Sequence, residues 1–180
     1  ASSDSANLVI SNSARLQYTG GTVATDRGFT LAGGQGGIDV ANAATTLTIS
    51  GVAAGAGSLF KDGAGTLILG GANTYTGDTT VNGGILRAGS AQAFGPTGRM
   101  TVNSGATLEL GGFNASFLSV IGDGLIDLGG RTLTTGGAGG VFTGRITGTG
   151  GYTRTGGFNQ TLSGCNNDYT GVTTIGGTLS

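Results

Sequence analysis

The chain has 180 residues, a formal net charge of −1, 41 glycines, no histidine and one cysteine. So much glycine suggests a flexible chain, but 37 % of the residues are hydrophobic and only 9 % are charged, whereas disordered chains are poor in apolar residues and rich in net charge. The basic side chains are scattered singly. They form no basic stripe that could follow a phosphate backbone, so no nucleic-acid partner is expected.

Short strands are the elements that the sequence predicts along the whole chain. Apolar and polar residues alternate in the windows 28–33, 37–41, 45–51, 101–110, 125–130 and 144–148, which is the pattern of half-buried strands. Each run spans about 3 to 6 residues and ends in turn signals such as Gly-Gly or Asn-Gly. The residues predicted to point inward are Phe29, Leu31, Ile38, Val40, Leu47, Ile49, Val102, Leu108, Leu110, Ile126, Leu128 and Ile146.

Helix content is expected to be near zero. No window has the apolar spacing of a helix, and glycine interrupts every candidate at a cost of about 1 kcal/mol relative to alanine. The weakest point of this prediction is residues 90–98, where Ser90 could cap one short turn before Gly95 and Pro96 end it.

One phrase of the chain occurs twice. Residues 55–72 align with residues 148–165 at an offset of 93, and the Asn-x-Tyr-Thr-Gly-x-Thr-Thr motif that follows aligns at an offset of 94. Internal similarity of this kind is the signature of a repeat architecture. We assign a structural role in the repeat motif to Gly63, Gly65, Leu67, Leu69, Asn73, Tyr75, Gly77, Thr79, Thr80, Val81, Leu162, Asn167, Tyr169, Gly171, Thr173, Thr174 and Ile175.

An all-β solenoid accounts for these features. The strands are too short for a sandwich and too irregularly spaced for propeller blades, whereas coils of about 20 to 25 residues would give roughly 7 to 9 stacked coils. Residues 1–180 are predicted to form one segment, with repeat copies at 55–89 and 148–180 and spacer coils at 1–54 and 90–147. Glycine and asparagine are expected to supply positive φ at the corners. The asparagines beside corners are Asn73, Asn82, Asn103, Asn114 and Asn167.

The first copy, DGAGTLILGGANTYTGDTTVNGGILRAGSAQAFG, resembles the passenger-associated transport repeat, also called the autotransporter-associated β-strand repeat, of bacterial type V secretion proteins. The second copy, GCNNDYTGVTTIGGTL, is similar to a diverged instance of it. The resemblance implies a right-handed parallel β-helix on the surface of a Gram-negative cell, in the outer membrane or released from it. It also implies a partner, the C-terminal outer-membrane β-barrel of the same protein.

Family members use such repeats to help carry the passenger across the outer membrane and fold it there, so the expected function is structural. The alternative is an adhesin surface that binds host cells or matrix, as in virulence, or sister passengers in autoaggregation. Its discriminator is an exposed row of aromatic or charged side chains along one face. Uncapped strand edges at both ends would also favour end-to-end self-association.

Catalysis is not expected. Two hydrolytic carboxylates must lie about 5 to 9 Å apart, but about 13 Å of strand-like chain separates Asp123, in a glycine corner, from Asp127, on an outward strand position. The lack of histidine removes the commonest general base. One pattern similar to calcium-binding β-rolls, at residues 33–39, places Asp39 one residue late. We therefore expect no catalytic residue, cofactor, metal ion or small-molecule substrate.

Five side chains are judged individually. Lys61 and Arg154 align with each other and are expected to point outward as solubilising residues, the alternative being a stacked basic row for a partner. Tyr75 and Tyr169 are expected to cover a corner or cap the narrow core, the alternative being two rings exposed on one face for carbohydrate or protein contacts. Cys165 is expected to be a small buried residue, the alternative being an accessible thiol.

Overall fold

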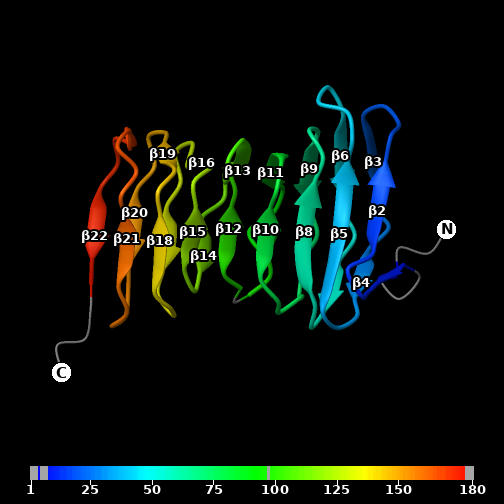
Figure 1. The fold of residues 1–180 in the computed structure, drawn as a ribbon, viewed down its shortest axis with the longest axis horizontal. Coiled ribbons are helices and arrows are strands. Elements are labelled where there is room, and N and C mark those ends of the chain that lie inside the picture. Colours follow the sequence, from blue (N-terminus) through cyan, green and yellow to red (C-terminus); the bar gives the residue numbers. More distant parts are fainter. Residues whose placement is uncertain (1–3, 5–7, 97, 177–180) are drawn as a thin grey trace.

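The chain folds into a parallel β-solenoid whose coils stack along one axis (Figure 1). The computed structural model describes residues 4, 8–96 and 98–176, and these residues form strands and turns without a helix. The end of the predicted second repeat copy, residues 177–180, lies outside the described residues.

Each coil passes through three faces, and each face is a stack of parallel strands. Face 1 contains β1 (Val9–Ile10), β4 (Phe29–Leu31) and β7 (Ala53–Gly55), then β14 (Ala115–Phe117), β17 (Leu133–Thr135), β20 (Tyr152–Arg154) and β22 (Thr173–Ile175). Face 2 contains β2 (Arg15–Tyr18), β5 (Gln35–Val40), β8 (Ser58–Asp62), β10 (Thr79–Val81), β12 (Met100–Val102), β15 (Val120–Gly122), β18 (Gly140–Phe142) and β21 (Gln160–Leu162). Face 3 contains β3 (Val23–Thr25), β6 (Thr46–Ile49), β9 (Thr66–Leu69), β11 (Gly84–Ala88), β13 (Ala106–Glu109), β16 (Leu125–Asp127) and β19 (Arg145–Thr147).

Face 2 is uninterrupted, so the number of its strands gives the number of coils. Its 8 strands lie side by side in chain order, so the solenoid makes about eight turns. The expected all-β solenoid of roughly 7 to 9 coils is confirmed.

Face 1 is interrupted in two successive coils, where residues 73–76 and 92–95 replace strands. The first of these segments still pairs with β7, because Thr74 N–H donates to Ala53 O at 2.8 Å and Thr76 N–H donates to Gly55 O at 3.0 Å. The second contains one turn, in which Ala93 N–H donates to Ser90 O at 3.3 Å. The chain therefore makes the single turn expected near Ser90, and no helix follows.

The core is a set of side-chain rows that run along the axis. On face 3 the pairing register places apolar residues of successive coils directly over one another. This buried row is Leu47, Leu67, Leu86, Leu108, Ile126 and Ile146. Strand alternation sends the intervening side chains outward. All twelve residues predicted to point inward are buried, so the alternation was interpreted correctly.

The asparagines at the corners act differently from the prediction. Among the described residues, positive φ occurs at glycines and otherwise only at Asn12 and Ser13. The five predicted corner asparagines do not adopt it, and several act through their amide groups instead. Asn82 Nδ2 donates to Asp62 Oδ1 at 2.7 Å, and Asn103 Nδ2 donates to Asn82 Oδ1 at 2.8 Å, forming a ladder across three coils.

Candidate functional site

The two repeat copies share backbone conformation at their glycine corners. Gly55 and Gly148 have φ of 105° and 106°, and Gly63 and Gly156 have φ of 76° and 79°. L-amino acids rarely adopt such values, so each pair of corners needs glycine for the same reason.

The copies do not occupy the same faces. The first copy begins with β8 on face 2, whereas the second begins with β20 on face 1. The Asn-x-Tyr segments of the two copies also lie on different faces. Asn73 lies where face 1 is interrupted, but Asp168 N–H donates to Ile146 O at 3.0 Å, which places the second segment on face 3. The second copy is therefore rotated by one face about the axis.

Asn73 joins three successive coils. Its side chain is 3 % exposed. Its Oδ1 accepts from Ala53 N–H of the preceding coil at 2.7 Å, and its Nδ2 donates to Ala93 O of the following coil at 2.6 Å. Asn167 repeats the backward contact, because its Oδ1 accepts from Ile146 N–H at 2.8 Å. The Asn73 amide adds to the backbone bonds that Thr74 and Thr76 make to β7 where face 1 has no regular strand.

Tyr75 points into the core and is fully buried. Its hydroxyl shares a hydrogen bond of 2.8 Å with Thr79 Oγ1, and burial raises the pKa of the phenol well above its usual value. Tyr169 is partly buried against the core and forms the same bond with Thr173 at 2.7 Å. Both rings thus cover the core, as expected, and they lie on different faces.

Gly77 and Gly171 allow close approach of consecutive coils. A Cβ atom at Gly77 would lie 2.4 Å from Gly57 O, and one at Gly171 would lie 2.3 Å from Gly150 O. Real Cβ atoms do not come so close to backbone oxygen. Within the motif, both glycines are therefore required by packing.

The remaining motif residues of the first copy lie mainly in the core. Gly65, Leu67, Leu69, Thr79 and Val81 are buried, and Thr80 is half-buried on the outward side of β10. In the second copy Leu162 is half-buried, whereas Thr173, Thr174 and Ile175 of β22 are exposed.

Lys61 and Arg154 point inward, so the prediction that they are outward solubilising residues was wrong. Lys61 is fully buried in a face 2 row between Ile38 and Val81, and Arg154 is 5 % exposed in a face 1 row between Thr135 and Ile175. Strand alternation decides the direction, because Lys61 shares its parity with Leu59 and Arg154 with Tyr152. For Arg154 this shared parity is a signal in the sequence, whereas for Lys61 the apolar Phe60 leaves either parity open.

Backbone carbonyls surround the Lys61 ammonium group. Nζ donates to the carbonyl oxygens of Asp62, Gly63 and Gly83 at 2.8, 2.9 and 2.9 Å. Burial lowers the pKa of Lys61 from 10.5 to about 8, while the carboxylates of Asp39 and Asp62 oppose the shift. Lys61 is thus a structural cation held by a corner.

The prediction for Cys165 was also wrong, because its thiol is exposed. The residue lies in the turn between β21 and β22, outside the strands whose alternation buries side chains. Asp123 is exposed at a corner and Asp127 is half-buried on the outward side of β16. In the described part of the chain, no group of three His, Cys, Asp or Glu side chains could hold a metal ion.

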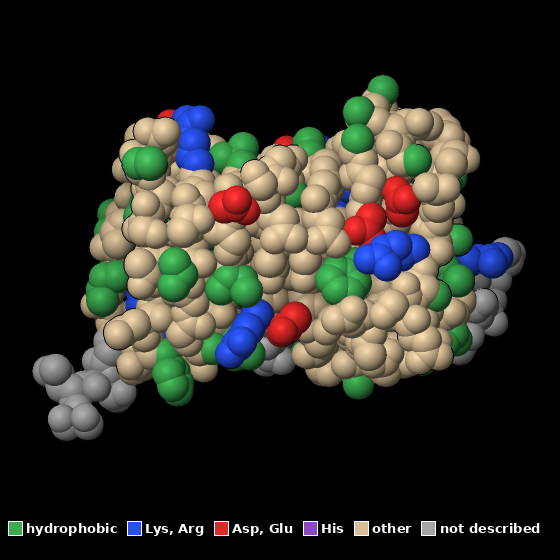
Figure 2. Space-filling model, viewed as in Figure 1, with side chains coloured by type: hydrophobic (Ala, Val, Ile, Leu, Met, Phe, Trp, Pro, Cys, Tyr) green, Lys and Arg blue, Asp and Glu red, His purple; other side chains and the backbone are tan. Residues whose placement is uncertain are grey.

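The outer surface is sparsely charged. Figure 2 shows the side of the molecule that carries face 2, where charged side chains are few and scattered among polar groups and backbone. Ion pairs also join different coils, namely Arg15 with Asp62 on face 2, and Arg87 with Glu109 and Arg145 with Asp168 on face 3. Within residues 8–96 and 98–176, the structure has no helix able to cross a bilayer.

Comparison with known proteins agrees with this architecture. The sequence model of the passenger-associated-transport-repeat family matches residues 59–88 and 153–180. The chain is 61 % identical over 181 residues to the adhesin BmaC autotransporter of Brucella suis biovar 1 (strain 1330), an alignment that covers 99 % of this chain and 5 % of that protein. The chain therefore spans a small part of the length of this relative. No solved structure matches the chain.

The family model matches the two parts of the sequence that resemble the transport repeat. Both comparisons agree with the predicted transport repeats and with the expected localisation at the bacterial cell surface and outer membrane. The duplicated corners, the two Asn-x-Tyr segments and these similarities lead to one conclusion: the chain carries two passenger-associated transport repeats and is similar over nearly its whole length to part of an autotransporter.

Proposed function

We propose that this segment is a non-catalytic scaffold that promotes translocation of the passenger across the outer membrane and its folding at the cell surface. The observation that carries the proposal is the contact made by Asn73, whose side chain bonds the coil before it and the coil after it. In a solenoid, stability comes from each coil and its interface with the next coil. A residue that joins three coils makes folding propagate from one coil to its neighbour.

Stepwise folding of this kind can bias movement through a pore. Each coil that packs on the folded template outside the cell can no longer slide back as an extended chain. The motif residues assigned above would act at this step, with Asn73 bridging coils, Tyr75 sealing the core and Gly77 permitting close approach. The repeat copies at 55–89 and 148–180 and the spacers at 1–54 and 90–147 belong to this proposal as one continuous unit. Its covalent partner is the C-terminal outer-membrane β-barrel of the full protein.

Two deletions of equal length test the role of the repeat in the full-length protein. Leu59 pairs with Thr79, and Met100 pairs with Val120. Removing residues 59–78 or residues 100–119 therefore excises one coil while preserving the face 2 register on both sides. Only the first deletion removes motif residues, from Gly63 to Gly77, so the second is its matched control.

Display on intact cells and resistance of the displayed passenger to protease are the quantities to measure. We expect both to fall severalfold for the 59–78 deletion and to stay near the wild-type level for the 100–119 deletion, with β-barrel insertion unchanged in both. Equal effects of the two deletions, or none, would contradict a special role of the repeat in secretion and folding.

An adhesive surface is the second candidate function. It is favoured by the name of the relative, an adhesin that is 61 % identical to this chain. The discriminating row of tyrosines is not formed, because Tyr75 is buried and Tyr169 lies on another face. Normal display of the 59–78 deletion together with lost adhesion to host cells or between bacteria would favour this function instead.

A further inference from the structure

The face 2 ladder is thin between two successive coils, those of β15 and β18. β15 pairs with β12 at three residues, and β18 pairs with β21 at three residues. Between β15 and β18 the register joins Gly122 to Phe142, and its continuation would set Val120 beside Gly140. Val120 is fully buried, so its backbone N–H and C=O groups need hydrogen-bond partners at this place.

The side chain of Gln160 supplies these partners from the coil after next. Its Oε1 accepts from Val120 N–H at 3.0 Å, and its Nε2 donates to Val120 O at 2.7 Å. An amide that bonds both groups of one residue does what the backbone of a neighbouring strand does in a parallel ladder. Gln160 belongs to β21, so its amide passes the intervening strand β18 to reach β15.

Glycine at position 140 leaves room for this amide. A Cβ atom at Gly140 would lie 2.8 Å from Val120 O and 3.0 Å from Gln160 Oε1. Gly140 does not have a positive φ. Space for the crossing side chain, rather than backbone conformation, therefore accounts for glycine at this position.

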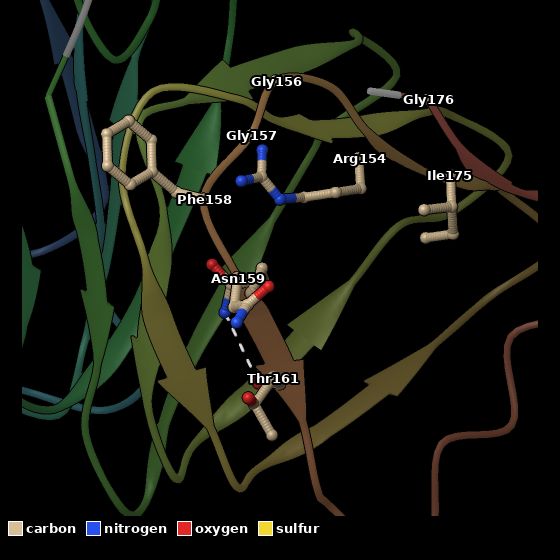
Figure 3. A pocket seen from close by; sticks show the side chains of 9 residues that line it. Arg154, Gly156, Gly157, Phe158, Asn159, Thr161, Ile175 and Gly176 are labelled. Atoms are coloured by element: carbon tan, nitrogen blue, oxygen red, sulfur yellow. Dashed lines mark hydrogen bonds between the residues drawn. The ribbon is translucent and has the colours of Figure 1, made fainter. Parts of the chain in front are cut away.

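The orientation of the amide is fixed by its contacts. Because Val120 N–H requires an acceptor and Val120 O requires a donor, Oε1 and Nε2 of Gln160 cannot exchange places. Nε2 also lies 3.5 Å from Thr161 O, a long contact with its own strand. Figure 3 shows this part of β21 between the labelled Asn159 and Thr161, and its dashed line marks that contact.

A similar crossing occurs on the outer side of face 2. Arg15 of β2 forms an ion pair with Asp62 of β8, two strands away, and its guanidinium group lies 5.4 Å from the ring centroid of Phe60. The strand between them carries Gly37, where a Cβ atom would lie 2.7 Å from Arg15 Cγ. In both places a long side chain passes a glycine of the middle strand and bonds the strand beyond it.

We propose that Gln160 is a strap that completes the interface between the coils of β15 and β18, so that these two coils and the coil of β21 fold and unfold as one cooperative unit. In a solenoid whose coils contact only their neighbours, coils two apart are not directly coupled. The first repeat has Leu67 at the aligned position, so the strap is a feature of the second repeat. The proposal concerns packing of the coils and stands whether or not the repeat has a secretion role.

Hydrogen exchange measured by mass spectrometry on the full-length passenger tests the strap. Gln160→Met keeps the length of the side chain but removes the amide. We expect the Val120 amide to exchange about tenfold faster in this variant, as loss of its hydrogen bond implies, and β15 and β18 to lose protection together. Gln92→Met is the matched control, because Gln92 is exposed and should leave protection unchanged.

A second variant tests the passage at Gly140. Gly140→Ala should cost more protection at Val120 in the wild type than in Gln160→Met, because only in the wild type does the added Cβ atom displace the amide. Gly130→Ala is its control, since a Cβ atom there would lie in ordinary contact, 3.5 Å from Thr149 Oγ1.

Three results would overturn the proposal. The first is a Gln160→Met protein in which Val120 stays as protected as in the wild type. The second is a loss of protection confined to β21, which would mean that the amide supports its own strand alone. The third is an equal effect of Gly140→Ala in the two backgrounds, which would show that the glycine and the amide are not coupled.

Discussion

The hydroxyl groups of Tyr75 and Thr79 lie 2.8 Å apart in the core of the solenoid, and neither side chain is more than 1 % exposed. The pair satisfies the one polar atom of a large buried ring. Tyr152 solves the same problem with a partner in the preceding coil, Thr135, at 2.6 Å. Buried tyrosine therefore depends on threonine throughout this fold.

Removing either hydroxyl should destabilise the protein. We expect Tyr75→Phe and Thr79→Val each to lower the free energy of unfolding by about 1 to 2 kcal/mol, because each leaves a buried hydroxyl or its partner unsatisfied. The double variant should lose no more than the larger single loss, since neither partner remains unpaired. Urea unfolding of the four proteins gives the coupling energy. Tyr18→Phe, at a half-buried tyrosine that bonds Gly21 O, should have a smaller effect. Strictly additive losses would show that the two hydroxyls do not interact.

Much of the fold could be predicted because period-2 patterning is a local signal with one structural meaning. Leu47 and Ile49 point inward in β6, as their spacing indicates, and the duplicated phrase correctly indicated a solenoid. The direction of Lys61 was missed because Leu59 and Phe60 are both apolar, so either parity of β8 was open. In the structure Phe60 lies outside, beneath the guanidinium of Arg15 at 5.4 Å from its ring centroid.

The rotation of the second repeat could not be predicted from the motif. Tyr75 and Tyr169 occupy the same place in their copies, yet their faces depend on how many residues each intervening coil uses. Those lengths are set by loops such as the turn near Ser90, whose geometry follows from tertiary hydrogen bonds such as that from Ser90 Oγ to Gly71 O at 2.7 Å. Motif placement in the sequence is therefore a reliable guide to local structure but not to the face.

Gly77→Ala should be strongly destabilising. The added Cβ atom would lie 2.4 Å from Gly57 O, and the backbone of the neighbouring coil cannot move away without breaking the stack. We expect the free energy of unfolding to fall by about 2 to 4 kcal/mol, which is at or above the usual cost of overpacking a core. Gly21→Ala is the matched control, because a Cβ atom there has nothing within 4 Å. Comparable thermal unfolding of the two variants would contradict the close approach at Gly77.

Asn73→Asp should weaken the interface between coils more than it alters any single strand. The substitution replaces the Nδ2 donor, 2.6 Å from Ala93 O, with a carboxylate oxygen that repels that carbonyl. At neutral pH this places an unpaired charge in a site that is 3 % exposed, at a cost of about 3 kcal/mol or more. Hydrogen exchange should show lost protection on both sides of residue 73, near Ala53 and Ala93.

Asn159→Asp supplies the control for this change, because Asn159 is exposed. It introduces the same charge outside the core and should leave exchange rates unaltered. If Asn73→Asp lost protection on one side only, Asn73 would join two coils rather than three.

Stability should depend on pH through Lys61. Burial lowers its pKa to about 8 in the folded chain, against 10.5 for an ordinary lysine. Between these values the unfolded chain binds more protons than the folded chain, so the free energy of unfolding rises with pH across that window and is independent of Lys61 below it. The neutral amine keeps two N–H donors for its carbonyl partners and no longer carries a buried charge.

The charged groups that face Lys61 are Asp39 and Asp62, and Asp62 is itself paired with Arg15. Lys61→Arg keeps its charge across the same range, so subtracting its stability curve removes the contribution of tyrosines that titrate near the upper limit. Urea unfolding between pH 7 and pH 10.5 should give a difference, wild type minus Lys61→Arg, that is flat up to about pH 8 and then increases. Parallel curves would mean that Lys61 is solvated in the folded chain and is not the buried partner of three carbonyls.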